Sequence, residues 1–474
     1  MEQRNRIRFG TGGWRAVIGD DFTKENVQRV TNGLLAYIRE QGKTSDPVMI
    51  GYDRRFLSEP AARWTAEILA SGGIKVWFLK RSAPTPLVMH TVLKKQLSFG
   101  IEITASHNPP NYNGYKLIVA EGRDAPLETT QHLEELINTL EPEQPRSFEE
   151  LCESGMIRFI QNPFNDYLDD ILAQIDVAAL RKRGIRVLFD TMHGSGTYPL
   201  MVVFHTARCT IDAMNINKDA YFGGDMPAPG ERQLRPLQNA VIRGGYDLGI
   251  ALDGDGDRLG IIDEEGRYIS ANEILCMLYY YLLKYKGWKG GVVRNLSTTH
   301  MLDKIAESFG EQCYEVPVGF KWISSGIDEH NAVLGGESSG GLTVRGHIHG
   351  KDSVYAAALF AEMLSVTEMC PREILEQLEK QYGRFVMAED NITLQSGQKE
   401  HLRKYLMEER KLPEFDIPVK NVSYMDGCKI LFENGDFVLC RFSGTEPLLR
   451  VTAESGDKET AESYIRKFRD FLKI

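Results

Sequence analysis

The sequence lacks any apolar run close to the roughly 18 residues that a membrane-spanning helix requires. Its opening residues, MEQRNRIRFG, also lack the apolar core of a signal peptide. Basic charge is scarce: 56 Lys and Arg stand against 66 Asp and Glu, giving a formal net charge of −10. Because general nucleic-acid binding needs a basic face, we expect neither a nucleic-acid nor a membrane partner. Anionic substrates are not excluded, since local basic groups decide their binding.

Cysteine pairs of the CxxC type are also absent. The odd number of cysteines and their wide spacing indicate reduced thiols in a cytoplasmic protein rather than a disulfide framework. We expect most of these side chains to be buried as small apolar groups. The seven residues are Cys152, Cys209, Cys276, Cys313, Cys370, Cys428 and Cys440.

The remaining composition is that of a soluble globular protein. Hydrophobic residues make up 42% and charged residues 26%, which excludes a largely disordered chain. The 474 residues are enough for several buried cores and suggest about three or four domains.

Short apolar strands alternate with helical patterns over most of the chain. Helices are expected over 23–40, 271–287 and 353–366, with further helices after Ser58 and Pro86. Strands are expected at 48–53, 74–79, 99–104, 185–190, 246–253, 291–295, 313–317 and 332–336. This alternation predicts βαβ units and mainly parallel sheets. The segment 131–158 interrupts the rhythm, and we interpret it as a connector.

The last 90 or so residues differ from the rest. Two alternating strands flank Asn434-Gly435, which is a strong hairpin signal, and a further strand and an amphipathic helix over 457–472 follow. We therefore predict three similar α/β domains with mixed, mainly parallel sheets and a smaller C-terminal α+β domain, arranged around a central cleft. The predicted boundaries are 1–150, 151–262, 263–384 and 385–474.

Three of the expected strands run directly into unusual polar loops. The strand 99–104 leads into Ala105-Ser106-His107, the strand 246–253 into Asp253-Gly-Asp-Gly-Asp, and the strand 332–336 into Gly336-Glu337-Ser338-Ser339. In open α/β sheets, ligands bind beyond the carboxyl ends of the strands. The repeat suggests that similar domains direct such loops toward one site.

Asp253, Asp255 and Asp257 are separated by single glycines. Carboxylates this close repel one another by about 1 kcal/mol or more per pair near a surface, and a cation relieves the repulsion. Ligands that are all oxygen suit Mg²⁺ or Ca²⁺. An EF-hand is a rival because Glu264 stands at the twelfth position, but Arg258 replaces the required glycine and strands flank the loop. We therefore favour Mg²⁺, and a plain solvated acidic turn is the alternative.

Ser106 lies in the sequence TASHNPP, directly after a strand. A hydroxyl at a strand end, fixed by two prolines, is a candidate nucleophile. Adjacent residues of an extended segment face opposite ways, so His107 is not expected to act as its base. Lys116 supplies a cation nearby. A turn serine with a capping role is the alternative interpretation.

Two further loops offer groups that suit phosphate and sugar. Arg441-Phe442-Ser443-Gly444-Thr445 combines hydroxyls, an arginine and a glycine that lets backbone N–H groups converge, as a phosphate dianion requires. The loop 336–341, GESSGG, offers a carboxylate and hydroxyls suited to sugar hydroxyls. A polar β-turn and an ordinary αβ loop are the respective alternatives. The loop GTGGWR at 10–15 is a weaker signal of the same kind.

In this order, the motifs TASHNPP, DGDGDR, GESSG and RFSGTEP resemble the α-D-phosphohexomutase superfamily, the phosphoglucomutases and phosphomannomutases. The segments FGTGGWR (9–15) and GYDRR (51–55) also look like family segments. The resemblance covers nearly the whole chain. It implies an enzyme that acts on sugar phosphates and works as a monomer or homodimer.

The resemblance also implies a role for each matching residue. Ser106 would carry the phosphoryl group and contribute an oxygen to a Mg²⁺ held by Asp253, Asp255 and Asp257. Arg15, Lys116 and Arg258 would steady charge around the transferring group, and Glu337 and Ser339 would bind sugar hydroxyls. The non-reacting phosphate would be held by Arg441, Ser443, Gly444 and Thr445. Gly319 and Lys321 resemble a further substrate segment.

The implied reaction interconverts hexose 1-phosphate and hexose 6-phosphate, with hexose 1,6-bisphosphate as intermediate and activator. Glucose is favoured, mannose is the second choice, and N-acetylglucosamine ranks lower. The chain departs from some relatives in having Gly341 where they have histidine. That acid/base role is either absent from this chain or filled by His347, in the sequence GHIHGKD, which is our candidate for it. In the same stretch Ser353 replaces a usual glycine.

Two other functions are compatible with these residues. A hexose 1,6-bisphosphate synthase would use the same groups with an external phosphoryl donor and release the bisphosphate. A non-catalytic sugar-phosphate sensor would not need the seryl hydroxyl, the three aspartates and the complete phosphate loop together.

Overall fold

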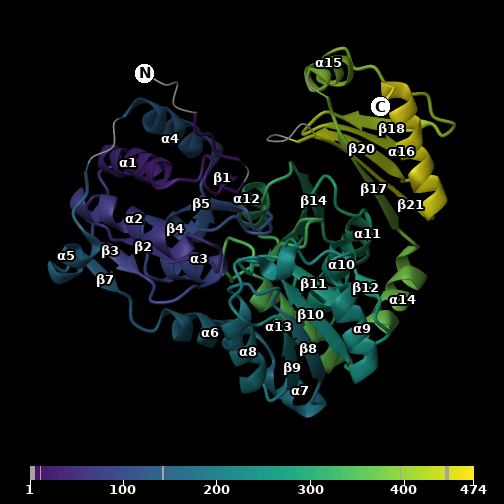
Figure 1. Ribbon diagram of the computed structural model, residues 1–474. Helices are drawn as coiled ribbons and strands as arrows, with labels where there is room; N and C mark the ends of the chain where they lie inside the picture. The colour runs from purple at the N-terminus through teal and green to yellow at the C-terminus, as the bar shows by residue number, and fades with distance from the viewer. Residues whose placement is uncertain (1–5, 11, 141–143, 396, 444–447) are drawn as a thin grey trace. The chain divides into compact units, whose positions relative to one another are not determined.

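The computed structural model describes residues 6–10, 12–140, 144–395, 397–443 and 448–474 (Figure 1). The chain divides into two compact units. The first consists of the residues up to Ile274 together with Leu334–Pro371, and the second of Leu275–Val333 with Arg372–Ile474. The helix α10 (Ala271–Lys284) leads from one unit into the other.

The first sheet of unit 1 has the order β1-β5-β4-β2-β3-β7, with β6 paired to β5. Its strands are β1 (Trp14–Val17), β2 (Val48–Tyr52), β3 (Val76–Phe78), β4 (Phe99–Ile103), β5 (Tyr112–Val119), β6 (Arg123–Asp124) and β7 (Ile157–Phe159). The strands β4, β2, β3 and β7 are parallel, whereas β5 is antiparallel to both β4 and β1. The mixed, mainly parallel sheet is as predicted.

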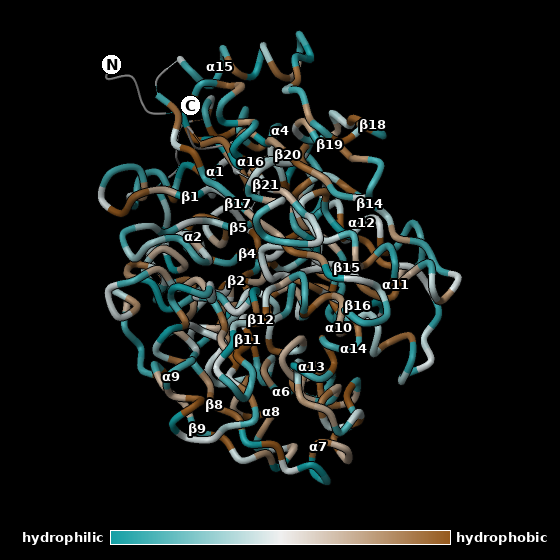
Figure 2. The backbone as a smooth tube through the Cα atoms, turned by 90° about the vertical axis from the view of Figure 1, so that its right-hand side faces the viewer, coloured by the Kyte–Doolittle hydropathy of each residue, from teal (hydrophilic) through white to brown (hydrophobic). Residues whose placement is uncertain are grey.

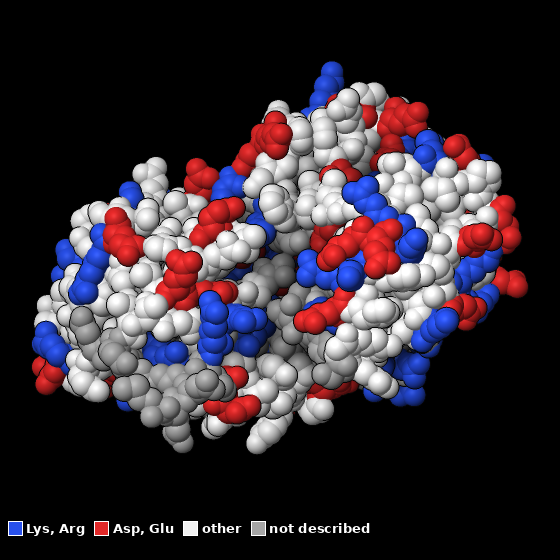
Figure 3. Space-filling model, turned by 90° about the horizontal axis from the view of Figure 1, so that it is seen from above, with Lys and Arg blue, Asp and Glu red and all other residues white. Residues whose placement is uncertain are grey.

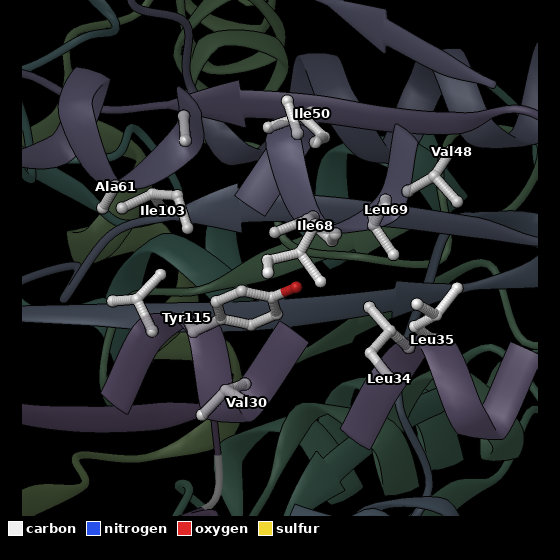
Figure 4. Packing of buried hydrophobic residues seen from close by; sticks show 14 of the residues in the cluster. Val30, Leu34, Leu35, Val48, Ile50, Ala61, Ile68, Leu69, Ile103 and Tyr115 are labelled. Atoms are coloured by element: carbon white, nitrogen blue, oxygen red, sulfur yellow. The ribbon is translucent and has the colours of Figure 1, made fainter. Parts of the chain in front are cut away.

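Helices cover this sheet through their apolar faces. They are α1 (Lys24–Glu40), α2 (Ser58–Ser71), α3 (Thr85–Lys94), α4 (Leu127–Thr139) and α5 (Phe148–Glu153). In Figure 4 the ring of Tyr115 from β5 lies between Val30 of α1 and Ile68 of α2. Each Å² of apolar surface that is buried stabilises the folded chain by about 25 cal/mol, so such a core is the main stabilising contribution.

The prediction of a connector over 131–158 was wrong in part. The described part of that segment contains most of α4, all of α5 and the start of β7. The sequence of α4 shows few apolar residues at helical spacing, because the helix buries only Leu133 and Ile137 where it packs beside α1. The acidic and proline-containing residues around it obscured two short elements that tertiary packing stabilises.

The second sheet of unit 1 has the order β12-β11-β10-β8-β9. It contains β8 (Arg186–Asp190), β9 (Thr210–Met214), β10 (Leu248–Leu252), β11 (Leu259–Ile262) and β12 (Tyr268–Ile269). The strands β9, β8 and β10 are parallel. The helices are α6 (Pro163–Gln174), α7 (Val177–Arg183), α8 (Thr197–Thr206) and α9 (Arg235–Gly244). The antiparallel pair β15 (Leu334–Gly336) and β16 (Leu342–Val344), with the buried helix α13 (Ser353–Thr367), completes the unit.

Unit 2 begins with the parallel pair β13 (Val292–Asn295) and β14 (Cys313–Val316) and the helices α11 (Met301–Ser308), α12 (Phe320–His330) and α14 (Pro371–Tyr382). An antiparallel sheet of order β17-β21-β20-β19-β18 follows. Its strands are β17 (Val386–Thr393), β18 (Val419–Ser423), β19 (Cys428–Phe432), β20 (Phe437–Phe442) and β21 (Leu448–Ser455), with α15 (Gln398–Arg403) and α16 (Lys458–Leu472). The hairpin between β19 and β20 at Asn434-Gly435 is as predicted, and Gly435 has a φ of 93°.

The remaining features agree with the composition. All seven cysteines are free. Apolar stretches run through many sheet strands, while much of the connecting chain is hydrophilic (Figure 2). Lys and Arg are interspersed with Asp and Glu on the face shown in Figure 3. Within the described residues no single helix is long and apolar enough to cross a bilayer, although α13 and α14, bent by 79°, pass that test together on length and composition.

Candidate active site

Ser106 lies three residues beyond the end of β4, and its side chain contacts the aspartate loop that follows β10. Its hydroxyl Oγ donates to Asp253 Oδ2 at 3.0 Å. The residue is 2% exposed and has a φ of 50°, in the left-handed region that side chains rarely adopt. The predicted pairing of the seryl and aspartate loops is therefore present within unit 1.

The expectation that His107 faces away from Ser106 was wrong. It assumed an extended segment, but the left-handed turn at Ser106 brings the two side chains together, with Oγ 3.1 Å from His107 Nδ1. Burial and the cations Arg258 and Arg15 lower the pKa of His107 well below its usual range, so its ring is neutral at pH 7. A neutral imidazole can exchange a proton with the serine oxygen.

The three aspartates of the loop place one carboxylate oxygen each within 4.8 Å of one another. Asp253 Oδ1 accepts the backbone N–H groups of Asp257 and Arg258 at 2.8 and 3.0 Å. Asp255 Oδ2 accepts the hydroxyl of Thr85 at 2.6 Å. The buried Oδ1 atoms of Asp255 and Asp257 have no hydrogen-bond partner among the described residues.

These free oxygens fit a divalent cation. A buried carboxylate oxygen without a donor is costly, and an oxygen-only donor set suits Mg²⁺. Burial together with Asp255 and Asp257 raises the pKa of Asp253 well above its usual range. Gly254 is needed because a Cβ there would lie 2.7 Å from the carbonyl oxygen of Ser106. A larger residue would push the aspartate loop away from the serine.

Cationic groups surround the same loop. Lys116 Nζ lies 3.2 Å from Asp124 Oδ1 and 3.7 Å from Asp257 Oδ2. Although burial alone would lower the pKa of Lys116, these carboxylates raise it above its ordinary value, so the ammonium is charged. Arg15 donates to Asn108 Oδ1 at 2.7 Å, which places it beside the seryl loop. Arg258 Nε lies 3.8 Å from Asp257 Oδ1.

Lys351 was not among the predicted site residues, yet its Nζ lies 2.9 Å from Asp257 Oδ2. Although burial would raise the pKa of Asp257, Lys351 and then Lys116 hold it below its usual range. A Cβ on Gly341 would fall 2.1 Å from Lys351 Cδ. The departure noted at position 341 therefore has a physical consequence, because a Cβ there would force the Lys351 side chain to shift.

The loop after β15 lies beside the start of β11. The N–H of Leu259 donates to the Gly340 carbonyl at 3.1 Å, which holds the GESSG loop next to Arg258. Glu337 is buried and Ser339 is exposed. Three strand-end loops, after β4, β10 and β15, are thus assembled in unit 1 as the strand pattern indicated.

His347 occupies a buried network instead of an open position. Its Nε2 lies 2.8 Å from Asp352 Oδ2, and its Nδ1 lies 3.2 Å from Gln174 Nε2. The Tyr167 hydroxyl also donates to Asp352, which caps α13. With both ring nitrogens bonded to side chains, this geometry gives no support to the acid/base role predicted for His347.

In unit 2 one carboxylate joins two of the predicted substrate segments. Asp426 Oδ2 accepts the backbone N–H of Val318 at 3.0 Å and Arg441 Nε at 2.9 Å. Val318 precedes Gly319, which caps α12 with a φ of 127°, and Lys321 lies in the first turn of that helix. No sequence motif marked Asp426.

The phosphate loop is described only in part. Ser443 is 8% exposed, its N–H donates to the Leu448 carbonyl at 2.9 Å, and its carbonyl accepts from Lys399 Nζ at 2.6 Å. The predicted contributions of Gly444 and Thr445 lie outside the described residues.

Solved structures define the class of protein. A protein of Thermus thermophilus is 27% identical, with a TM-score of 0.85 over 99% of this chain and 100% of its own. The open form of the phosphoglucomutase pp63/parafusin from Paramecium is 20% identical, with a TM-score of 0.83 over 99% and 95% of the two chains. The chain thus has the four-domain fold of phosphohexomutases.

Sequence relatives identify the family. The phosphoglucomutase/phosphomannomutase α/β/α domains I, II and III match residues 6–144, 165–266 and 270–382, and the C-terminal domain matches 403–471. A phosphoglucomutase/phosphomannomutase of Thermococcus kodakarensis is 29% identical over 96% of both chains. A phosphoglucosamine/phosphogalactosamine mutase of Sulfurisphaera tokodaii is 26% identical over 98% of both. The chain belongs to the phosphoglucomutase/phosphomannomutase family, whose members are enzymes.

Proposed function

We propose that this enzyme interconverts hexose 1-phosphate and hexose 6-phosphate, with Ser106 as the residue that carries the phosphoryl group. The observation that carries the proposal is the hydrogen bond of 3.0 Å from Ser106 Oγ to Asp253, which is one of the three buried carboxylates of the aspartate loop. A hydroxyl next to a cation-binding loop and several cationic side chains is suited to phosphoryl transfer, which depends on positioning and charge neutralisation.

Mg²⁺ would be held by Asp253, Asp255 and Asp257 together with an oxygen on Ser106. When bound, it would neutralise charge on the transferring phosphoryl group. Lys116, Lys351, Arg15 and Arg258 supply positive charge around the same loop. Asp257 is held ionised by the two lysines, which keeps this ligand available for the metal.

Substrate contacts are assigned to the remaining loops. We assign Glu337 and Ser339 to sugar hydroxyls, and Gly319 and Lys321 to a further substrate segment. The non-reacting phosphate is assigned to Arg441, Ser443, Gly444 and Thr445. Arginine binds phosphate in a bidentate, charge-assisted manner, which supports this part of the proposal. The proposal also retains the four domains predicted from the sequence, with their boundaries unchanged.

The proposed transfer has two halves. The bond between phosphorus and Ser106 Oγ breaks while a bond to the 6-hydroxyl oxygen of hexose 1-phosphate forms, giving hexose 1,6-bisphosphate. The 6-hydroxyl proton passes to the serine oxygen that leaves phosphorus, and the neutral His107 ring, 3.1 Å from that oxygen, is placed to relay it. In the second half Ser106 accepts the 1-phosphate, and hexose 6-phosphate is released.

We favour glucose phosphate as substrate, and glucosamine phosphate is the competing choice because the Sulfurisphaera tokodaii relative is named for it. Phosphorus NMR with glucose, mannose, glucosamine and N-acetylglucosamine 1-phosphates, each with and without a bisphosphate primer, ranks the four. We expect conversion of glucose 1-phosphate to glucose 6-phosphate, lost in Ser106→Ala. Full turnover by Ser106→Ala would end the proposal. Net release of bisphosphate, matched by consumption of an external donor, would instead identify a synthase.

A further inference from the structure

Arg55 lies just beyond β2, and its guanidinium is buried inside the loop that carries Ser106. Its Nη2 donates to the carbonyl oxygens of Ser106 and Asn108 at 2.5 and 2.6 Å. Its Nη1 donates to the carbonyl oxygens of Pro109 and Tyr112 at 2.8 and 3.1 Å. One side chain therefore donates to four backbone carbonyl oxygens between Ser106 and the first residue of β5.

This arrangement depends on the chemistry of arginine. Carbonyl oxygens that converge inside a protein need donors, because a buried acceptor without one costs free energy comparable to a lost hydrogen bond. The Pro109 oxygen also accepts the backbone N–H of Tyr112 at 3.0 Å. A guanidinium offers five N–H groups in a fixed plane, whereas the lysine ammonium is a compact point charge with three donors. Lysine at position 55 would keep the charge but could not bond all four oxygens in their present positions.

Asp53 fixes the same loop from its other side. Its carboxylate pairs with Arg55 Nε at 3.3 Å, and both side chains are fully buried. Its Oδ2 also accepts the hydroxyl of Thr104 at 2.7 Å. The Thr104 oxygen in turn accepts the backbone N–H of Ser106 at 2.8 Å. The N–H and the C=O of Ser106 are thus both anchored by the segment after β2.

We propose that Arg55 is a positioning residue, which together with Asp53 holds Ser106 in its left-handed conformation and so directs Oγ toward Asp253. The inference rests on the proposed function of Ser106. A φ of 50° is unfavourable for serine and persists only when its surroundings enforce it. Arg55 donates a hydrogen bond neither to Ser106 Oγ nor to a carboxylate of the aspartate loop, so its effect on transfer passes through the backbone.

The neighbouring arginine provides a matched control. Arg54 Nη1 donates to the carbonyl oxygens of Ile216 and His193 at 2.9 and 3.4 Å, outside the seryl loop. Arg54→Lys and Arg55→Lys therefore make the same chemical change one residue apart. Only the second change removes donors from the carbonyl groups around Ser106.

The experiment compares both variants with the wild-type enzyme in glucose 1-phosphate turnover, and in labelling of Ser106 by glucose 1,6-bisphosphate measured by intact-protein mass spectrometry. We expect Arg55→Lys to lower kcat and the labelling rate by about 100-fold, because a displacement near 1 Å costs roughly that much. KM should stay within about threefold if the phosphate and sugar loops are undisturbed. Arg54→Lys should retain wild-type kinetics.

A chemical rescue separates positioning from general stability. Guanidinium chloride at millimolar concentration should restore part of the labelling rate of Arg55→Ala, and methylammonium chloride should not. If Arg55→Lys keeps the wild-type labelling rate and kcat, the inference is overturned. It is also overturned if Arg55→Lys loses the circular dichroism spectrum of the folded protein, because Arg55 would then serve stability alone. Failure of the wild-type enzyme to label at Ser106 would instead refute the proposed function.

Discussion

The side chain of Lys351 lies over the Cα of Gly341, and its ammonium reaches Asp257 Oδ2 at 2.9 Å. The residue after the GESSG motif and a lysine ten residues later are therefore coupled by packing. The absence of a side chain at Gly341 leaves space for Lys351 to reach the aspartate loop. The residue at position 341 is therefore constrained by the packing of Lys351 and not by a chemical role of its own.

The first prediction tests this coupling. Gly341 is not among the glycines with positive φ, so alanine fits its backbone. Its Cβ would nevertheless displace Lys351, and we expect Gly341→Ala to lower kcat by about tenfold, consistent with loss of a charge-assisted hydrogen bond of roughly 1.5–3 kcal/mol. In a Lys351→Ala background the same change should have little further effect. Additive losses in the double variant would contradict the coupling.

The second prediction concerns the proposed metal. Asp255→Asn keeps an oxygen for the Thr85 hydroxyl but places an NH₂ group where the unpaired Oδ1 stood. We expect Mg²⁺ affinity to fall by at least about tenfold, as measured by calorimetric titration, with a matching loss of turnover. Asp166→Asn, which alters an exposed ion pair with Lys95, is the control. Unchanged Mg²⁺ binding in Asp255→Asn would remove this residue from the metal site.

A third prediction addresses the substrate end. Asp426→Ala removes the acceptor shared by Arg441 and the N–H of Val318. Freed of its partner, the Arg441 guanidinium loses its fixed orientation, and we expect KM for the sugar phosphate to rise about tenfold while kcat changes little. Asp416→Ala, which removes only an exposed pair with Lys467 in the same domain, should leave KM unchanged. Equal KM values for both variants would show that Asp426 does not serve substrate binding.

Much of this site follows from local sequence patterns. The apolar run before Ser106 predicts a strand, and the alternation of glycine and aspartate at 253–257 predicts a cation-binding loop, because both depend on neighbouring residues alone. The contact between the two loops followed from the position of polar residues at strand ends.

The residues that were missed depend on geometry that no local pattern carries. His107 meets Ser106 because of one left-handed φ, and Asp426 joins residues 108 and 15 positions away in the chain. Arg55 was part of a segment that looked familiar, but the four carbonyl groups it bonds are defined only once the loop is folded. Long-range hydrogen bonds of this kind have no sequence period.

The final prediction is a pH dependence of stability in unit 2. Glu454 is 1% exposed, and its Oε1 accepts the N–H of His300 at 2.9 Å. Burial raises the pKa of Glu454 from 4.5 to about 7. Below pH 4.5 the carboxyl is protonated in both the folded and the unfolded chain, so this group carries no penalty there. As pH rises from 4.5 to 7 the unfolded chain loses the proton first, and the folded protein is destabilised progressively.

Glu454→Gln removes this titration while keeping an amide oxygen for the His300 N–H. The shift from 4.5 to about 7 corresponds to at most about 3 kcal/mol at 1.36 kcal/mol per pH unit. We therefore expect the variant to be more stable than the wild-type enzyme by up to that amount at pH 8, and nearly equal to it at pH 4.5, in urea unfolding followed by circular dichroism. An equal difference in unfolding free energy at both pH values would mean that folding does not shift the pKa of Glu454, because a titrating group changes stability with pH only when its pKa differs between the folded and unfolded chains.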